Sequence, residues 1–264
     1  MLRKVGRSER AGAPVAAGAA ERWTAVRRAV AHAATGVRLR ARARRFLRDA
    51  EIHPRDDLVE LGSRGYGFWV VPAGLLGPDS RCYLAGVGED ITFDVALIAR
   101  FGCTVHAFDP VPAARAYAEA AARHEPRFVF HPVGLWSSDT TLPLHAPAIE
   151  GHISHSVTDL HGTRKVADAP VRSVASLMRE LGDERLDLLK ISAEGAEYEI
   201  LAGLAEDDVD VRIICVEFAQ PAPRGRPEQA YEGLRARGYH LVEARVRPWT
   251  WKLTFVRDGT DVAG

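Results

Sequence analysis

From residue 81 onward, short apolar runs alternate with segments of helical length. The runs with the length of strands are 82–87, 104–108, 128–133, 186–191, 211–218, 239–246 and 249–256. Strands that alternate with helices predict a parallel sheet with helices on both faces. Only a few residues separate the last two runs, and a parallel pair would need a long crossover, so these two must pair antiparallel. We therefore expect an α/β, doubly wound, mostly parallel sheet that ends in an antiparallel hairpin.

The N-terminal segment has a different charge from the rest of the chain. Residues 1–48 carry 13 Lys+Arg against two glutamates, a net charge of +11, and the remainder carries −11 because the whole chain is neutral. Apolar residues recur at helical spacing from Glu21 to Asp49, and residues 1–20 are expected to be disordered. We expect residues 1–50 to form a basic, partly disordered arm with an amphipathic helix, and residues 51–264 to form the folded domain. Contact with nucleic acid or a membrane surface, and a targeting role, are the alternatives for this arm.

Cysteine usage and hydropathy indicate the kind of cellular compartment in which the protein is expected. The three cysteines all lie in or beside apolar, strand-like runs, and an odd count without paired spacing argues against a disulfide framework or a zinc site. Buried free thiols fit a reducing cytoplasm. No apolar run approaches the ~18 residues of a membrane span.

Two glycines lie between the first strand of this series and the helix that follows it, in "YLAGVGEDITFD". In a doubly wound sheet, ligands bind at such strand-to-helix turns. Gly86 and Gly88 fit the first two positions of a dinucleotide fingerprint, but Ile91 occupies the third. Without that glycine, room for a pyrophosphate is doubtful.

Acidic residues near this loop favour a cationic ligand. Asp109 ends the second strand, where a carboxylate can accept hydrogen bonds from both hydroxyls of a ribose. Glu89 and Asp90 lie within the loop, where they would repel a pyrophosphate but suit a ligand with an ammonium and a sulfonium. These features favour S-adenosylmethionine over NAD. A tight turn with Asp109 as a helix cap is the structural alternative.

Longer phrases resemble the FkbM-type S-adenosylmethionine-dependent methyltransferases. The phrases are "GVGEDITFDVALIARFGCTVHAFDP", "GLWSSDTTLPL", "LDLLKISAEGAEYEILAGL" and "IICVEF". The similarity runs from about Leu61 to Val256. It implies a seven-stranded class I methyltransferase sheet, S-adenosylmethionine as methyl donor and, usually, a hydroxyl as acceptor.

The resemblance also implies site residues. Gly86, Gly88 and Asp90, with Glu89 beside them, would line the methionyl part of the donor, and Asp109 would bind the ribose. The segment "GSRGYGFWVV" resembles the part of the family that precedes the first strand, and it could close over the cofactor through Tyr66 and Trp69.

One position departs from the family pattern. The family phrase commonly reads Lys-Ile-Asp-x-Glu-Gly, whereas Ser192 stands here in place of the aspartate. This loses a charge at the mouth of a strand, so reduced or altered activity is one consequence to consider.

Methyl transfer from a sulfonium requires alignment of the two reactants, and an alcohol acceptor needs a base that takes its proton. Glu194 follows the fourth strand and Glu217 ends the fifth, so both qualify as catalytic candidates. His155, in the loop "EGHISHSVTDLHG", is the preferred base because its flanking serines suit a turn. Asp139 could cap a turn or contact the adenine amino group.

The histidines of that loop match no standard metal spacing, so no metal is expected. The leading hypothesis is O-methylation of a small-molecule or sugar hydroxyl. A non-catalytic protein that binds S-adenosylmethionine, and an NAD-dependent oxidoreductase, are the alternatives. Nucleic acid is a weaker candidate as acceptor, because the basic excess lies in the arm and no Asn/Asp-Pro-Pro-aromatic loop is present.

Overall fold

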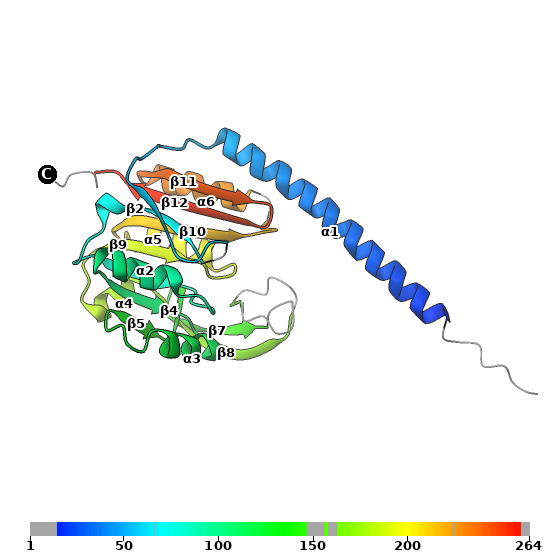
Figure 1. Ribbon diagram of the computed structural model, residues 1–264, viewed down its shortest axis with the longest axis horizontal. Coiled ribbons are helices and arrows are strands. Elements are labelled where there is room, and N and C mark those ends of the chain that lie inside the picture. Colours follow the sequence, from blue (N-terminus) through cyan, green and yellow to red (C-terminus); the bar gives the residue numbers. More distant parts are fainter. Residues whose placement is uncertain (1–14, 66, 147–155, 158–162, 224, 260–264) are drawn as a thin grey trace, which may run out of the picture.

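A seven-stranded sheet forms the centre of the protein (Figure 1). The computed structural model describes residues 15–65, 67–146, 156–157, 163–223 and 225–259, with the backbone alone for 15–30. In spatial order the strands are β11 (Tyr239–Arg247), β12 (Thr250–Arg257), β10 (Val211–Ala219), β9 (Leu186–Ile191), β3 (Arg81–Ala85), β4 (Thr104–Phe108) and β5 (Phe128–His131). The five strands β10, β9, β3, β4 and β5 run parallel, whereas β12 pairs antiparallel with β10 and β11. The predicted mostly parallel sheet with a closing hairpin is confirmed.

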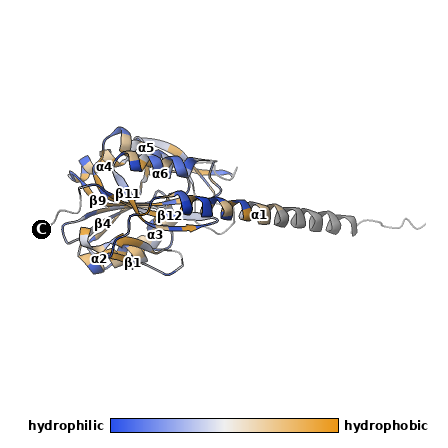
Figure 2. Ribbon diagram, turned by 90° about the horizontal axis from the view of Figure 1, so that it is seen from above, coloured by the Kyte–Doolittle hydropathy of each residue, from blue (hydrophilic) through white to orange (hydrophobic). Residues whose placement is uncertain are grey.

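Helices cover both faces of this sheet (Figure 2). On one face lie α4 (Val174–Leu181), α5 (Glu197–Glu206) and α6 (Arg226–Ala236). On the other lie α2 (Thr92–Phe101), α3 (Pro112–Ala121) and a hairpin of β1 (Leu58–Leu61) and β2 (Trp69–Pro72), which a 3₁₀ turn, η1 (Ala73–Leu75), follows. The three layers bury both faces of the central strands, as a parallel sheet requires.

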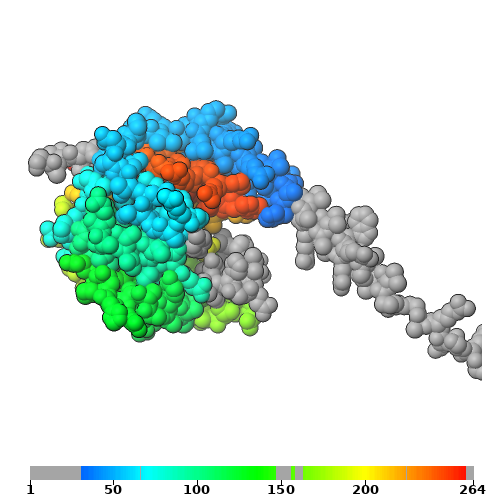
Figure 3. Space-filling model, viewed as in Figure 1, coloured from blue at the N-terminus to red at the C-terminus, as the bar shows by residue number. Residues whose placement is uncertain are grey.

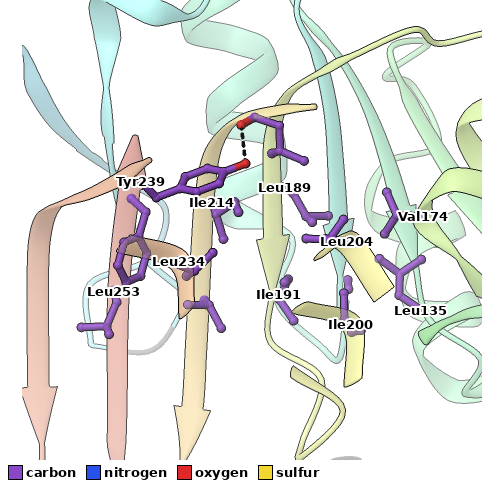
Figure 4. Packing of buried hydrophobic residues seen from close by; sticks show 14 of the residues in the cluster. Leu135, Val174, Leu189, Ile191, Ile200, Leu204, Ile214, Leu234, Tyr239 and Leu253 are labelled. Atoms are coloured by element: carbon purple, nitrogen blue, oxygen red, sulfur yellow. Dashed lines mark hydrogen bonds between the residues drawn. The ribbon is translucent and has the colours of Figure 1, made fainter. Parts of the chain in front are cut away.

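The central strands are apolar because both of their faces are covered. All six residues of β9 are buried, as are four of the five in β3. Figure 4 shows Leu189 and Ile191 of the sheet packed toward Ile200 and Leu204 of α5. In the same view the buried hydroxyl of Tyr239 donates a 2.8 Å hydrogen bond to the carbonyl of Val211, so its polar end is satisfied inside the core.

The sequence analysis predicts no strand between β5 and α4, and here the structure differs. This segment contains β6 (Gly134–Trp136), β7 (Thr140–His145) and β8 (Lys165–Ser173), which form a separate sheet in the order β6-β8-β7. The first four residues of β8 are exposed, so this strand has no apolar run that would mark it in the sequence. The hairpin of β1 and β2 was likewise not predicted.

The basic segment forms one long helix, α1 (Val15–Asp49), which extends away from the sheet (Figure 1). It begins at Val15, before the helical spacing of apolar residues that starts at Glu21. Its last turns lie against the β11–β12 hairpin (Figure 3). There the Phe46 ring packs on Trp251, with 4.6 Å between ring centroids, and the Arg42 guanidinium holds both carboxylate oxygens of Glu228 at 2.8 and 2.6 Å. Among the described residues, no helix combines the length and the apolar character that crossing a bilayer needs.

Phe46 anchors α1, and its removal should weaken the whole fold. Phe46 is 5% exposed, whereas its neighbour Leu47 is 39% exposed. Phe46→Ala should lower the free energy of unfolding by roughly 3–5 kcal/mol, and Leu47→Ala by less than about 1 kcal/mol, because only the first change leaves a cavity. Urea unfolding followed by circular dichroism measures both. Equal effects of the two substitutions would contradict this account.

Candidate functional site

The glycine loop between β3 and α2 passes very close to the end of β9. Gly86 has φ +83°, and a Cβ atom added to it would lie 1.8 Å from the carbonyl oxygen of Ser192. Gly88 also has positive φ, at +55°. Only glycine fits both the conformation and the approach at position 86. Ile91, in place of the third glycine, is buried and precedes the first turn of α2.

Asp109, at the end of β4, holds this loop in place. One carboxylate oxygen accepts hydrogen bonds from the backbone N–H groups of Val87 and Gly88 at 2.9 and 3.1 Å, and the other accepts from Val111 N–H at 2.9 Å. The side chain is 7% exposed. A carboxylate has about four acceptor positions. With three occupied, it has room for one ribose hydroxyl unless the loop rearranges, rather than the two expected.

A pocket opens over the carboxyl ends of β3, β4, β9 and β10, where ligands bind in open α/β sheets. Near the end of β4 its lining is largely apolar, and near β9, β10 and β12 it is charged. The lining residues used below are Gly67, Trp69, Gly86, Gly88, Asp90, Asp94, Asp109, Val111, Leu135, Lys190, Ser192, Glu194, Glu217 and Lys252.

Two carboxylates mark the charged end beside α2. Asp90 accepts hydrogen bonds from Ser63 Oγ at 2.5 Å and from the backbone N–H of Thr92 at 2.9 Å. Burial raises its pKa, but these hydrogen bonds and the charge of Lys190 outweigh burial, so the pKa lies below its ordinary value. Asp94 is buried in the first turn of α2, and burial raises its pKa to about 6 despite the nearby charge of Lys190. The sequence analysis missed Asp94, although a carboxylate within the apolar face of a helix was a visible signal.

Glu217 lies at the end of β10 in a network of hydroxyls and ammonium groups. Its carboxylate accepts hydrogen bonds from Ser192 Oγ at 2.9 Å and from Thr250 Oγ1 at 2.6 Å. The Nζ atom of Lys252 lies 3.7 Å from the same carboxylate. Lys190 Nζ donates a 2.6 Å hydrogen bond to the carbonyl of Gly86 and so supports the glycine loop. The sequence analysis missed Lys252, the one lysine of β12.

Glu194 lines the same pocket just beyond β9. Its φ is +44°, a conformation that non-glycine residues rarely adopt. The hydroxyl of Ser156 donates a 2.5 Å hydrogen bond to the Glu194 carbonyl. Strained backbone of this kind often marks functional sites. The pocket thus brings together two of the three candidate catalytic residues.

Other candidates lie elsewhere. Glu89 is exposed and is absent from the lining. Asp139 also lies outside the lining: its carboxylate contacts the Arg172 guanidinium at 2.8 Å and accepts from the backbone N–H of Ser173 at 2.9 Å, which supports the start of α4. Tyr66 and His155 lie outside the described residues, as do the loop histidines His152 and His161. Within the part of the chain that the structure describes, no cluster of three or more His, Cys, Asp or Glu side chains could hold a metal ion.

This sheet order, with a pocket built on a glycine loop and a carboxylate at the end of the next strand, defines a class I S-adenosylmethionine-dependent methyltransferase domain. The chain belongs to the FkbM methyltransferase family, because residues 84–241, more than half of its length, match the Methyltransferase FkbM domain. The predicted family and fold are confirmed.

Curated relatives agree with this family. Two proteins named "Probable methyltransferase-like protein 24", from Homo sapiens and Rattus norvegicus, are each 28% identical over 129 residues. The match covers 49% of this chain but only 29% of the length of each relative.

Several solved structures share parts of the architecture. Aeropyrum pernix fibrillarin with bound S-adenosyl-L-methionine has a TM-score of 0.41 at 10% identity, over 69% of this chain and 68% of its own. An rRNA methylase from Streptococcus thermophilus has a TM-score of 0.42 at 11% identity, over 70% of this chain and 90% of its own. Similarity at this level supports no inference about ligand or acceptor.

Gly86 should tolerate no side chain. In Gly86→Ala the new Cβ would collide with the Ser192 backbone, whereas in the control Gly182→Ala, at φ +75°, it would meet no atom within 4 Å. The control should cost the roughly 1–2 kcal/mol of a left-handed alanine. Gly86→Ala should cost clearly more and should weaken S-adenosylhomocysteine binding. Urea unfolding and calorimetry measure the two effects, and equal stability losses would contradict the close approach.

Glu197, behind the pocket, should make stability depend on pH. Burial raises its pKa from 4.5 to about 7. One oxygen accepts a hydrogen bond from the backbone N–H of Gly195 at 3.0 Å, and the other has no hydrogen-bond partner among the described residues. A carboxyl group whose pKa is raised by folding binds its proton more tightly in the folded protein. Its contribution to the free energy of unfolding is therefore fully present below pH 4.5 and is lost as pH rises through 7.

Glu197→Gln should remove this dependence. At pH 8 the variant should be more stable than the wild type by a few kcal/mol, at about 1.4 kcal/mol per pKa unit, and at pH 4.5 the two should be similar. Urea unfolding at both pH values measures this difference. A variant that loses stability in parallel with the wild type would disprove the assignment to Glu197.

Proposed function

We propose that this protein transfers the methyl group of S-adenosylmethionine to a hydroxyl group of a small molecule, natural product or sugar. The observation that carries the proposal is the position of the Glu217 carboxylate at one end of the pocket that contains the glycine loop. The hydroxyls of Ser192, just after β9, and of Thr250 in β12 orient it there. A carboxylate fixed at that end can take the proton of an alcohol as the carbon–oxygen bond forms.

In this proposal the adenosine part and the methionyl part of the donor lie in different parts of the pocket. The apolar lining at Val111 and Leu135 suits the adenine, and one hydroxyl of the ribose can donate to Asp109. The methionyl part would then pass over Gly86 and Gly88 toward Asp90. Because Asp139 is engaged with Arg172, we assign it a structural role and no adenine contact.

The sulfonium methyl would point toward the ends of β9 and β10. Methyl transfer proceeds by in-line displacement: the acceptor oxygen forms a bond to the methyl carbon, the carbon–sulfur bond breaks, and S-adenosylhomocysteine leaves with the electron pair. Glu217 receives the proton, and Glu194 is the second candidate for this role. His155 stays a prediction, because it lies outside the described residues.

Glu217→Gln tests the base. It removes the proton acceptor but keeps the shape of the side chain, so methyl transfer should fall roughly 10²- to 10⁴-fold while S-adenosylhomocysteine affinity changes little. Glu206→Gln, at an exposed position at the end of α5, is the matched control and should leave the rate unchanged. Transfer of tritiated methyl from S-adenosylmethionine to a mixture of hydroxylated metabolites provides the rate. An unimpaired Glu217→Gln enzyme would exclude this role.

The product distinguishes the acceptor class. A methyl ether from a hydroxyl acceptor is stable to alkali, whereas a methyl ester from a carboxyl acceptor is hydrolysed and releases labelled methanol. Alkali-stable label therefore excludes a carboxyl acceptor, whereas alkali-labile label would contradict O-methylation of a hydroxyl.

A non-catalytic role in binding S-adenosylmethionine is the second candidate, because Ser192 stands where the family commonly has an aspartate. Calorimetry would detect donor binding in both cases, but only the enzyme would release S-adenosylhomocysteine in the presence of acceptors. The three free, buried cysteines suit a reducing compartment, and we propose a cytoplasmic location on that basis.

A further inference from the structure

The charged end of the pocket is lined by both positively and negatively charged side chains. Lys190 and Lys252 are the two basic residues among the described residues of the lining. The carboxylates of Asp90, Asp94 and Glu217 line the pocket at the same end, and Glu194 lines it just beyond β9. Such a mixture suits a ligand group that is itself zwitterionic.

Strand register sets the two lysines on one face of the sheet. Lys190 lies opposite Cys215, and Lys252 lies opposite Glu217, two residues further along β10. Residues directly opposite each other, and residues two apart on a strand, share a face. Thr254, on the same face of β12, donates a 2.8 Å hydrogen bond to the Val70 carbonyl. This is therefore the face that the β1–β2 hairpin covers.

Lys252 is held in a fixed position on that face. Its Nζ atom donates to the Phe68 carbonyl at 3.3 Å, lies 4.8 Å from the Trp69 ring centroid and is 3.7 Å from Glu217. The side chain is only 12% exposed. Burial lowers the pKa of Lys252, and the charge of Lys190 adds to this, while Glu217 opposes it. Burying an ammonium group is costly unless anionic groups compensate it.

The two lysines differ in what they already do. Lys190 donates its 2.6 Å hydrogen bond to the Gly86 carbonyl and thereby supports the loop. Lys252 contacts the segment that precedes β2, and its ammonium borders the space near Gly67 and Trp69. Lys252 is therefore the cation that a ligand at this end would meet.

The amino-acid end of S-adenosylmethionine has the complementary charges. It carries an ammonium and a carboxylate on one carbon, and a sulfonium nearby. Asp90 and Asp94 suit the two positive groups, and an ammonium aimed at the carboxylate forms a strong, charge-assisted hydrogen bond. We propose that Lys252 binds the α-carboxylate of the methyl donor and so selects ligands that have the amino-acid part. This inference rests on the proposed use of S-adenosylmethionine.

Two adenosine thioethers test it without knowledge of the acceptor. S-adenosylhomocysteine has the amino-acid end, and 5′-methylthioadenosine lacks it. Lys252→Met keeps the length and apolar contacts of the side chain but removes the charge. Calorimetry should give a roughly 10- to 100-fold weaker affinity of this variant for S-adenosylhomocysteine and an affinity for 5′-methylthioadenosine within about threefold of the wild type. Lys252→Arg should restore part of the loss.

Lys165→Met is the matched control, because Lys165 is an exposed residue of β8 that pairs with Asp168 and lies outside the lining. It should bind both ligands as the wild type does. Unchanged S-adenosylhomocysteine affinity in Lys252→Met, or equal losses for both ligands, would overturn the role of Lys252 while leaving donor use intact. A wild-type protein that binds neither ligand would overturn the proposed function together with this inference.

Discussion

The hydrogen bonds that Asp109 accepts from the glycine loop are the interaction on which the site depends. One buried carboxylate joins three segments: the end of β4, the loop after β3 and the start of α3. Each N–H group that it binds would otherwise be a buried donor without a partner. The loop can therefore lie flat across the sheet end, where Gly86 approaches the Ser192 backbone. The apolar end of the pocket lies on the β4 side of this loop, and the charged end lies on the side of β9, β10 and β12.

The properties of the charged groups in the pocket depend on how they are packed as well as on which residues they are. Lys190 is 7% exposed and the Lys252 side chain 12% exposed, and each ammonium group donates a hydrogen bond to a backbone carbonyl. Carboxylates of the same pocket experience opposite effects: hydrogen bonds hold the pKa of Asp90 low, whereas burial raises that of Asp94. Groups with such different proton affinities can serve as a fixed anion and a titratable one within a single pocket.

Much of this fold could be predicted from the sequence, because buried parallel strands leave continuous apolar runs, and the glycine pair marks the first ligand loop. The sheet of β6, β7 and β8 could not, since β6 has only three residues and β7 and β8 are largely or partly exposed and so leave no continuous apolar run. The same limit applies to the site. Glu194 lies just after an apolar strand and Glu217 near the end of another, so their place in the pocket could be predicted. That of Lys252 depends on the pairing of β12 with β10 and on the segment before β2. Neither is encoded in local spacing.

The contact between Ser192 and Glu217 gives a physical explanation for a serine at this position. Its hydroxyl donates to that carboxylate at 2.9 Å. An aspartate at this position would put a second carboxylate within hydrogen-bond distance of the first, and like charges at such separation oppose the ionisation of both. The serine instead supplies a proton donor, so a single negative charge stays localised at the end of β10, oriented by Thr250 from the other side. In the reaction that we propose, Glu217 of β10 is the proton acceptor, and the hydroxyl of Ser192 helps to orient it.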